Sequence, residues 1–136
     1  MKQIIVDAEI KNVEKVTDFV NAVLERYDCP VKAVMQIDVM IDELFSNIAY
    51  YAYAPEKGTA AVSVEMEEAP LSAVITFTDH GKPFDPLTLQ EPDVTQSAEE
   101  RKIGGLGIYL VKKTMDSIRY EYKDGQNILT VKKVMA

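Results

Sequence analysis

The sequence predicts an α+β fold: a two-layer α/β sandwich whose mixed, mostly antiparallel sheet carries its helices on one face. Two patterns of apolar residues support this prediction. In several short segments they alternate with polar residues, as in half-buried strands, and in longer segments they recur every three or four residues, as in amphipathic helices. The predicted strands also stand in pairs joined by short turns, which favours antiparallel neighbours, and helices packed on one face complete two layers.

A first strand is predicted over residues 3–11, followed by a helix. Apolar residues of the strand share one face: Ile4, Val6, Ala8 and Ile10. Asn12 is placed to cap the helix, which should end near residue 28 because the residue before Pro30 disfavours helical angles. A second helix is predicted from about 31 to 53. Its apolar stripe consists of Val34, Ile37, Ile41, Leu44 and Ile48.

Two further strands are predicted over residues 59–67 and 72–79. From residue 80 to about 103 no period is found, and a loop of this length is typical of a functional lid or of disorder. A helix should begin around Gly104, and the chain should end in a hairpin that turns at Asp124-Gly125. Because no repeat or boundary is visible, residues 1–136 are predicted to form one domain.

The composition is that of a globular protein with an acidic balance. The chain has 136 residues, 47% of them hydrophobic, and a formal charge of -7. This charge argues against nonspecific binding to nucleic acid or anionic membranes, although a local basic cluster would still suit an anionic ligand. The single Cys29 and single His80 argue against a disulfide and a zinc site. Without an apolar segment of sufficient length for a signal peptide or membrane span, a cytoplasmic protein is expected.

The second helix carries a carboxylate and a carboxamide on one side. Glu43 and Asn47 lie four residues apart, so they are neighbours on the flank of the apolar stripe. An asparagine oxygen is a suitable ligand for Mg²⁺, and a glutamate can accept a proton or orient water. Taken alone, the pair is better explained as a solvated pair or as a hydrogen bond within the helix than as a functional site.

The third strand ends in an acid on its inward face. Asp79 shares that face with Ile75 and Phe77, where a carboxylate requires a partner. An adenine amino group would suit, because a carboxylate only accepts hydrogen bonds, and Gly81 would let the backbone approach a flat ring. The alternative is an acid that caps a turn.

Three glycines crowd the start of the third helix: Gly104, Gly105 and Gly107. Helix N-termini present free N–H groups, and glycine lets phosphate oxygens reach them, although a flexible hinge would show the same cluster. The spacing matches neither a Walker A loop nor the dinucleotide fingerprint. Basic residues lie in or beside the lid: Lys82, Arg101 and Lys102. Lys112 and Lys113 are expected on a solvated helix face.

In order and spacing, "DELFSNIAYYAY", "DHGKPFDP" and "GGLGIYLVKKTMD" resemble the three boxes of the GHKL ATPase superfamily. The short layout is similar to that of the bacterial anti-sigma factor serine kinases, and the resemblance covers essentially the whole chain. It implies the Bergerat ATP-binding fold, with ATP and Mg²⁺ as cofactors. It also implies that Glu43 is the general base and that Asn47 holds Mg²⁺. The other nucleotide contacts that it implies are Asp79 and Gly81 at adenine, and Arg101, Gly104, Gly105, Leu106 and Gly107 at the phosphates.

The resemblance further implies an ATP-dependent protein serine kinase that acts as an anti-sigma factor. Such a bacterial cytoplasmic protein sequesters a sigma factor and phosphorylates an anti-anti-sigma partner of the STAS type, usually as a homodimer, without binding nucleic acid or membrane directly. The alternative is a nucleotide-binding partner switch with little or no kinase activity. Two departures favour it: Tyr51 stands where family members often have histidine, and Arg101 lies two residues before the family's arginine. A further departure, Pro83 in place of a second glycine, is associated with this short subgroup.

Two other interpretations remain. A detached histidine-kinase ATPase domain is less expected, because no phosphoacceptor helix precedes the first strand. An α/β interaction domain without a ligand would require all three motifs to coincide by chance.

Overall fold

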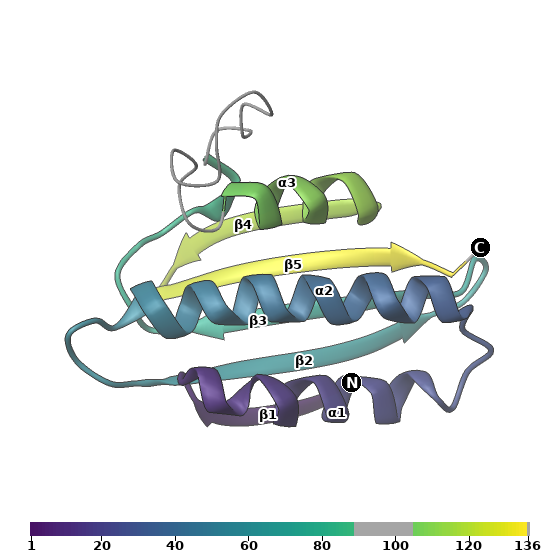
Figure 1. Ribbon diagram of the computed structural model, residues 1–136, viewed down its shortest axis with the longest axis horizontal. Helices are drawn as coiled ribbons and strands as arrows, with labels where there is room; N and C mark the ends of the chain where they lie inside the picture. Colours follow the sequence, from purple (N-terminus) through teal and green to yellow (C-terminus); the bar gives the residue numbers. More distant parts are fainter. Residues whose placement is uncertain (89–104, 136) are drawn as a thin grey trace.

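The computed structural model describes residues 1–88 and 105–135, which form a five-stranded sheet with helices on one face (Figure 1). The strands are β1 (Lys2–Asp7), β2 (Thr59–Glu67), β3 (Ser72–Asp79), β4 (Ser117–Lys123) and β5 (Gln126–Val134). The helices are α1 (Val13–Leu24), α2 (Val31–Asn47) and α3 (Gly105–Thr114). The sheet order is β1-β2-β3-β5-β4. The predicted fold class is confirmed, but each pairing of the described strands is antiparallel, where a mixed sheet was expected.

The first strand and helix are shorter than predicted. β1 ends at Asp7, and residues 10–12 form a short 3₁₀ helix. Asn12 does precede α1, but its side chain makes no capping hydrogen bond, because Nδ2 donates instead to the Asp7 carbonyl at 2.8 Å. This bond turns the chain out of the sheet, so the predicted alternation fails beyond Asp7. α1 ends at Leu24, four residues before the predicted end.

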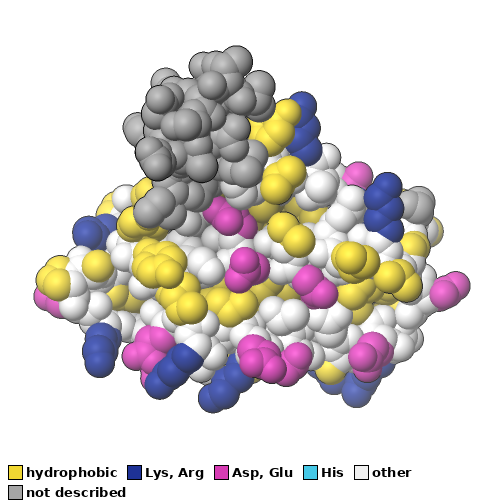
Figure 2. Space-filling view, in the orientation of Figure 1, with side chains coloured by type: hydrophobic (Ala, Val, Ile, Leu, Met, Phe, Trp, Pro, Cys, Tyr) yellow, Lys and Arg dark blue, Asp and Glu magenta, His cyan; other side chains and the backbone are white. Residues whose placement is uncertain are grey.

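Helix α2 lies between α1 and α3 and packs against both (Figure 1). Ile37, Ile41 and Leu44 of the predicted stripe are buried, and Met40 and Phe45 widen the buried face. Its solvent side leaves Val31, Met35 and Val39 exposed, and hydrophobic side chains are visible across the middle of this face (Figure 2). The α-helix ends at Asn47, and residues 48–52 continue it as a π-helix, where an uninterrupted α-helix was predicted.

The core lies between the helices and the inward face of β2, β3 and β5. The buried strand residues are Ala60, Val62, Val64, Ala73, Ile75, Phe77, Leu129 and Val131. Full burial of a Val, Leu, Ile or Phe side chain contributes roughly 1.5–3 kcal/mol. Because Asp79 and Asn127 continue the same inward face, the packing that fixes the core also fixes these two polar side chains.

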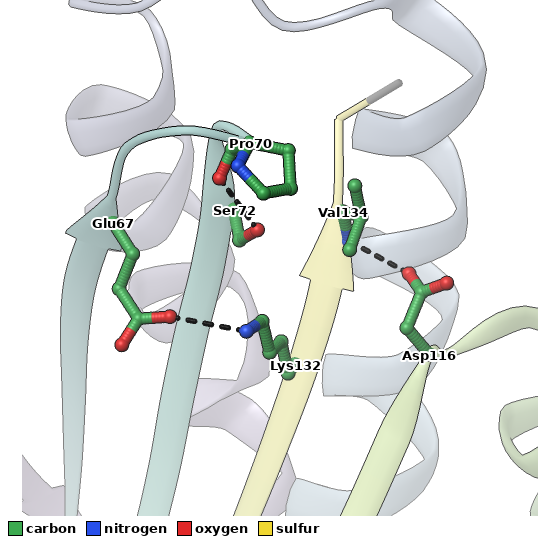
Figure 3. Close-up of polar contacts among 6 residues, drawn as sticks. All are labelled: Glu67, Pro70, Ser72, Asp116, Lys132 and Val134. Carbon is green, nitrogen blue, oxygen red and sulfur yellow. Dashed lines mark hydrogen bonds and ion pairs between the residues drawn. The ribbon is translucent and has the colours of Figure 1, made fainter.

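One tight turn and three polar contacts complete the sheet. The β4–β5 turn has positive φ at both Asp124 (54°) and Gly125 (76°), as in a type I′ hairpin, so the predicted turn is confirmed. At the other end of the sheet, contacts join Lys132 to Glu67, Val134 to Asp116 and Ser72 to Pro70 (Figure 3). Since β3 runs from Ser72 to Asp79, these contacts hold the end of the sheet that is remote from Asp79.

Candidate functional site

Helix α2 supplies the first two candidate residues in its last two turns. Glu43 is half-buried, and Asn47 is 8% exposed. The Asn47 Nδ2 is buried and has no hydrogen-bond partner among the described residues. A buried donor costs free energy unless water or a ligand satisfies it, so this N–H group can donate to a ligand group at the pocket. The π-helix begins immediately after Asn47, and such turns occur frequently at functional sites.

The first turn of α3 lies against Glu43. A Cβ atom on Gly107 would overlap the Glu43 carboxyl group, so only glycine leaves that carboxylate in its present place. Burial raises the pKa of Glu43 above its ordinary value, and the neighbouring Asp42 carboxylate raises it further. A raised pKa suits a group that must accept a proton near neutral pH.

Asp79 closes the inward face of β3, as the alternation predicted. It is 4% exposed, and its Oδ1 accepts hydrogen bonds from Gly81 N at 2.8 Å and from Asn127 Nδ2 at 2.9 Å. The first bond is the turn cap that the sequence offered as an alternative. Its Oδ2 accepts no hydrogen bond from the described residues, so one oxygen caps the turn and the other is available to a ligand.

Asn127 and Tyr120 were not identified from the sequence. Asn127 lies opposite Asp79 in the β3–β5 register, and its Oδ1 accepts from Phe84 N at 3.1 Å and from the Tyr120 hydroxyl. Burial raises the pKa of Tyr120, so its phenol remains a donor at neutral pH. One signal was present: Asn127 shares the inward face of β5 with the buried Leu129 and Val131.

These residues surround one pocket between the end of α2 and the sheet. Its lining is Leu44, Asn47, Ile48, Ala52, Phe77, Asp79, Phe84, Pro86, Tyr120, Asn127 and Leu129. The cavity volume is about 30 Å³, where roughly 10–15 Å³ on this measure already admits a water molecule, so it has room for water but not for a purine ring. A purine ring therefore requires lining residues to move, and Phe84 and Pro86 are the two contributed by the loop after β3. The Tyr51 ring lies 5.8 Å from that of Phe84.

The remaining predicted residues differ in how the structure places them. Gly81 does not line the pocket but packs on the π-helix, where a Cβ would collide with the Ala52 carbonyl. Gly105 and Leu106 form the start of α3. Arg101, Gly104, Lys102 and most of the predicted lid lie outside the described residues. Lys112, expected on a solvated face, instead donates to the Leu87 carbonyl at 3.0 Å.

The side chains at the pocket suit a nucleotide and Mg²⁺ only if the metal takes few protein ligands. In residues 1–88 and 105–135 no three His, Cys, Asp or Glu side chains gather to hold a metal by themselves. Mg²⁺ commonly takes one or two protein oxygens and completes its shell with water and phosphates. The Asn47 side-chain oxygen is of the type that this limited role requires, and Asp79 offers its free oxygen to the amino group of a nucleobase.

The arrangement therefore combines three groups. Asp79 offers a hydrogen-bond acceptor to a nucleobase, Asn47 offers an amide oxygen to a metal ion, and Glu43 is a carboxylate of raised pKa. Asn47 and Asp79 line one pocket, and Glu43 meets Gly107 one helical turn before Asn47 in α2. Such a set can orient a nucleotide and remove a proton from a hydroxyl that attacks its phosphate. Of the described helices, none has the length and hydrophobicity needed to cross a bilayer.

Comparison with known proteins relates this site to ATP-binding domains. Residues 6–133 match the family described as "Histidine kinase-like ATPase domain". The serine/threonine-protein kinase BtrW of Bordetella bronchiseptica is 28% identical over 90 residues, covering 66% of this chain and 63% of that protein. The serine-protein kinase RsbW of Listeria monocytogenes is 27% identical over 106 residues, covering 74% of this chain and 66% of that protein. The chain thus spans just under two thirds of the length of these relatives.

Solved structures share the fold at low sequence identity. The blue-light activated histidine kinase of Erythrobacter litoralis EL346 has a TM-score of 0.58 and 15% identity, covering 79% of this chain and 32% of that chain. A structure of its histidine kinase domain has a TM-score of 0.54 and 14% identity, covering 93% of this chain and 60% of that chain. The predicted resemblance to this class of ATPase and its fold is confirmed.

Proposed function

Because the chain belongs to the histidine kinase-like ATPase domain family, we propose that its pocket binds ATP and that it is a protein serine kinase acting as an anti-sigma factor. One observation carries the proposal: Asn47 and Asp79 reach the same pocket, one with an unpartnered amide and the other with a free carboxylate oxygen. The distant serine kinase relatives support the finer assignment.

In this proposal each described residue has one task. Asp79 Oδ2 accepts the adenine amino group, and Asn47 contributes an oxygen to Mg²⁺, which neutralises phosphate charge when bound. Glu43 takes the proton of the attacking serine hydroxyl, and its raised pKa suits it to do so near neutral pH. The free N–H groups at the start of α3 face the developing charge on the phosphates. Arg101 and Gly104 are proposed to assist at the phosphates.

The proposed partners are a sigma factor, which the protein would sequester, and an anti-anti-sigma protein of the STAS type, which it would phosphorylate on serine. A homodimer in the bacterial cytoplasm is part of the same proposal, as is one domain over residues 1–136. The proposal includes no direct contact with nucleic acid or membrane, in keeping with the formal charge of -7.

Calorimetry with ATP, in Mg²⁺ and again in EDTA, tests the nucleotide site. Wild type is expected to bind ATP at micromolar concentration with Mg²⁺. Asp79→Asn should weaken binding by about tenfold to a hundredfold under both conditions, because it loses a hydrogen bond to a charged acceptor. Asn47→Ala should remove only the gain in ATP affinity that Mg²⁺ gives to wild type. Asp124→Asn, in the exposed β4–β5 turn, is the matched control and should bind as wild type does. Absence of wild-type binding at millimolar ATP would reject the proposal.

A nucleotide-binding partner switch with little or no kinase activity is the second candidate. Tyr51 favours it, since an aromatic ring packed on Phe84 occupies the place where family members often have histidine. Transfer of labelled γ-phosphate to a purified STAS-type protein distinguishes the two. Transfer that Glu43→Gln abolishes would support the kinase, whereas tight ATP binding without transfer would support the switch.

A further inference from the structure

We propose that Asn127 and Tyr120 are positioning residues that leave a single free oxygen on Asp79, and that they thereby restrict the pocket to adenine nucleotides. The inference rests on the proposed function, because it concerns the nucleotide in the same pocket. It adds the means by which guanine nucleotides are excluded.

The orientation of the Asn127 amide is determined by its neighbours. The Phe84 backbone N–H can only donate, so the amide oxygen must face it, at 3.1 Å. The Tyr120 hydroxyl donates to the same oxygen. Nδ2 therefore faces the other way and donates to Asp79 Oδ1 at 2.9 Å and to the Lys82 carbonyl at 2.8 Å. A flipped amide would place an oxygen against both of these acceptors.

Asp79 Oδ1 is consequently saturated. It accepts from Asn127 Nδ2 and from Gly81 N, which uses both of its lone-pair positions. Only Oδ2 remains for a ligand. Since Asp79 and Asn127 are 4% and 6% exposed, water has little access to replace either bond.

One free oxygen distinguishes adenine from guanine. The adenine 6-amino group donates to a single acceptor, whereas guanine has an acceptor oxygen at that position. Guanine can still bind a carboxylate through two adjacent donors, N1–H and the 2-amino group, but that mode requires both carboxylate oxygens. Asn127 occupies one of them, so the bidentate mode is unavailable. The site would therefore select adenine both by binding its amino group and by denying guanine its bidentate contact.

The first experiment measures Kd for ATP and GTP by calorimetry on wild type, Asn127→Ser and Tyr120→Phe. Wild type should prefer ATP by at least about a hundredfold, because a site built around one acceptor leaves polar groups unpaired with the wrong base. Asn127→Ser should reduce the ATP/GTP preference by about tenfold or more, and Tyr120→Phe, which removes one bond to Asn127, by a few-fold. Tyr122→Phe is the matched control on β4, since Tyr122 is 45% exposed and its hydroxyl has no partner among the described residues.

The second experiment uses Asn127→Asp, which keeps the shape and replaces the donor by a second carboxylate. Two adjacent carboxylates raise the pKa of one of them, and the protonated form can donate to Asp79 as the amide did. The ATP affinity of this variant should therefore rise as pH falls from 8 to 5.5, with the wild type correcting for protonation of ATP itself. A merely structural role for Asn127 would give no such acid-dependent recovery.

The outcomes separate the two proposals. A lower ATP/GTP preference in the variants, with acid recovery in Asn127→Asp, supports the positioning role. Equal weakening of both nucleotides, or a wild type that binds ATP and GTP alike, overturns the inference and leaves ATP binding intact. A wild type that binds neither overturns the proposed function as well. Thermal melts check folding, and Tyr120→Phe decides the matter if the Asn127 variants do not fold.

Discussion

Glu43 has a raised pKa because its carboxylate is half-buried beside Asp42 and against the start of α3. For Glu43→Gln we expect phosphate transfer to fall by about a hundredfold to ten-thousandfold with ATP affinity unchanged, since only the proton acceptor is lost. In wild type, the transfer rate should fall as pH drops through the raised pKa of Glu43. Single-turnover transfer from labelled ATP measures both effects. Unchanged transfer in Glu43→Gln would rule out its role as base.

The same substitution has a predicted effect on stability. Since the folded-state pKa of Glu43 exceeds its unfolded value, the folded protein binds this proton more tightly. The resulting stability is fully present below the unfolded pKa and is lost as pH rises through the folded one. Glu43→Gln should therefore raise Tm at pH 8, with a smaller difference near pH 4. The exposed Asp42→Asn is the control, and it should leave transfer intact while lowering the pKa of Glu43.

At the scale of elements, two glycines bring α3 and the π-helix close to the site for different reasons. At Gly107 an added Cβ meets the far end of the flexible Glu43 side chain, whereas at Gly81 it meets the Ala52 backbone. Gly107→Ala should keep the fold and gain up to about 1 kcal/mol of helix propensity, yet lower transfer by displacing the carboxylate. Gly81→Ala should cost about 1–3 kcal/mol, because backbone must shift. Denaturant unfolding and transfer assays compare the two variants. Equal losses of stability would contradict this distinction.

The elements also show what the sequence could predict. Period-two and helical patterns located each main helix and strand, and the alternation of β3 correctly turned Asp79 inward. The end of β1 was missed because Asn12 bonds to Asp7 instead of capping α1. Asn127 was missed because its partners come from distant segments: Asp79 precedes it by 48 residues, and the bond between them depends on strand register. Local patterns carry no information about such a register.

At the scale of the whole molecule, the pocket joins elements from both halves of the chain. Its lining comes from α2, the π-helix, β3, the following loop, β4 and β5. A ligand that binds there contacts segments that separate when the chain unfolds, so it stabilises the folded state by mass action. If residues 1–136 form one domain, as we propose, unfolding should be a single cooperative transition that ATP shifts as a unit.

With Mg²⁺-ATP at a hundred times its Kd, we expect this single transition to move up by about 10 °C, because the ligand adds about 2.7 kcal/mol to a domain of this size. Asp79→Asn should lose about half of the shift or more at the same ATP concentration, since its weaker binding lowers the saturation. GTP should give wild type a much smaller shift, because one oxygen of Asp79 is already occupied by Asn127 and Gly81. Differential scanning calorimetry measures all three. Two separate transitions, only one of which responds to ATP, would show that the pocket belongs to an independently folding part and would contradict the single domain.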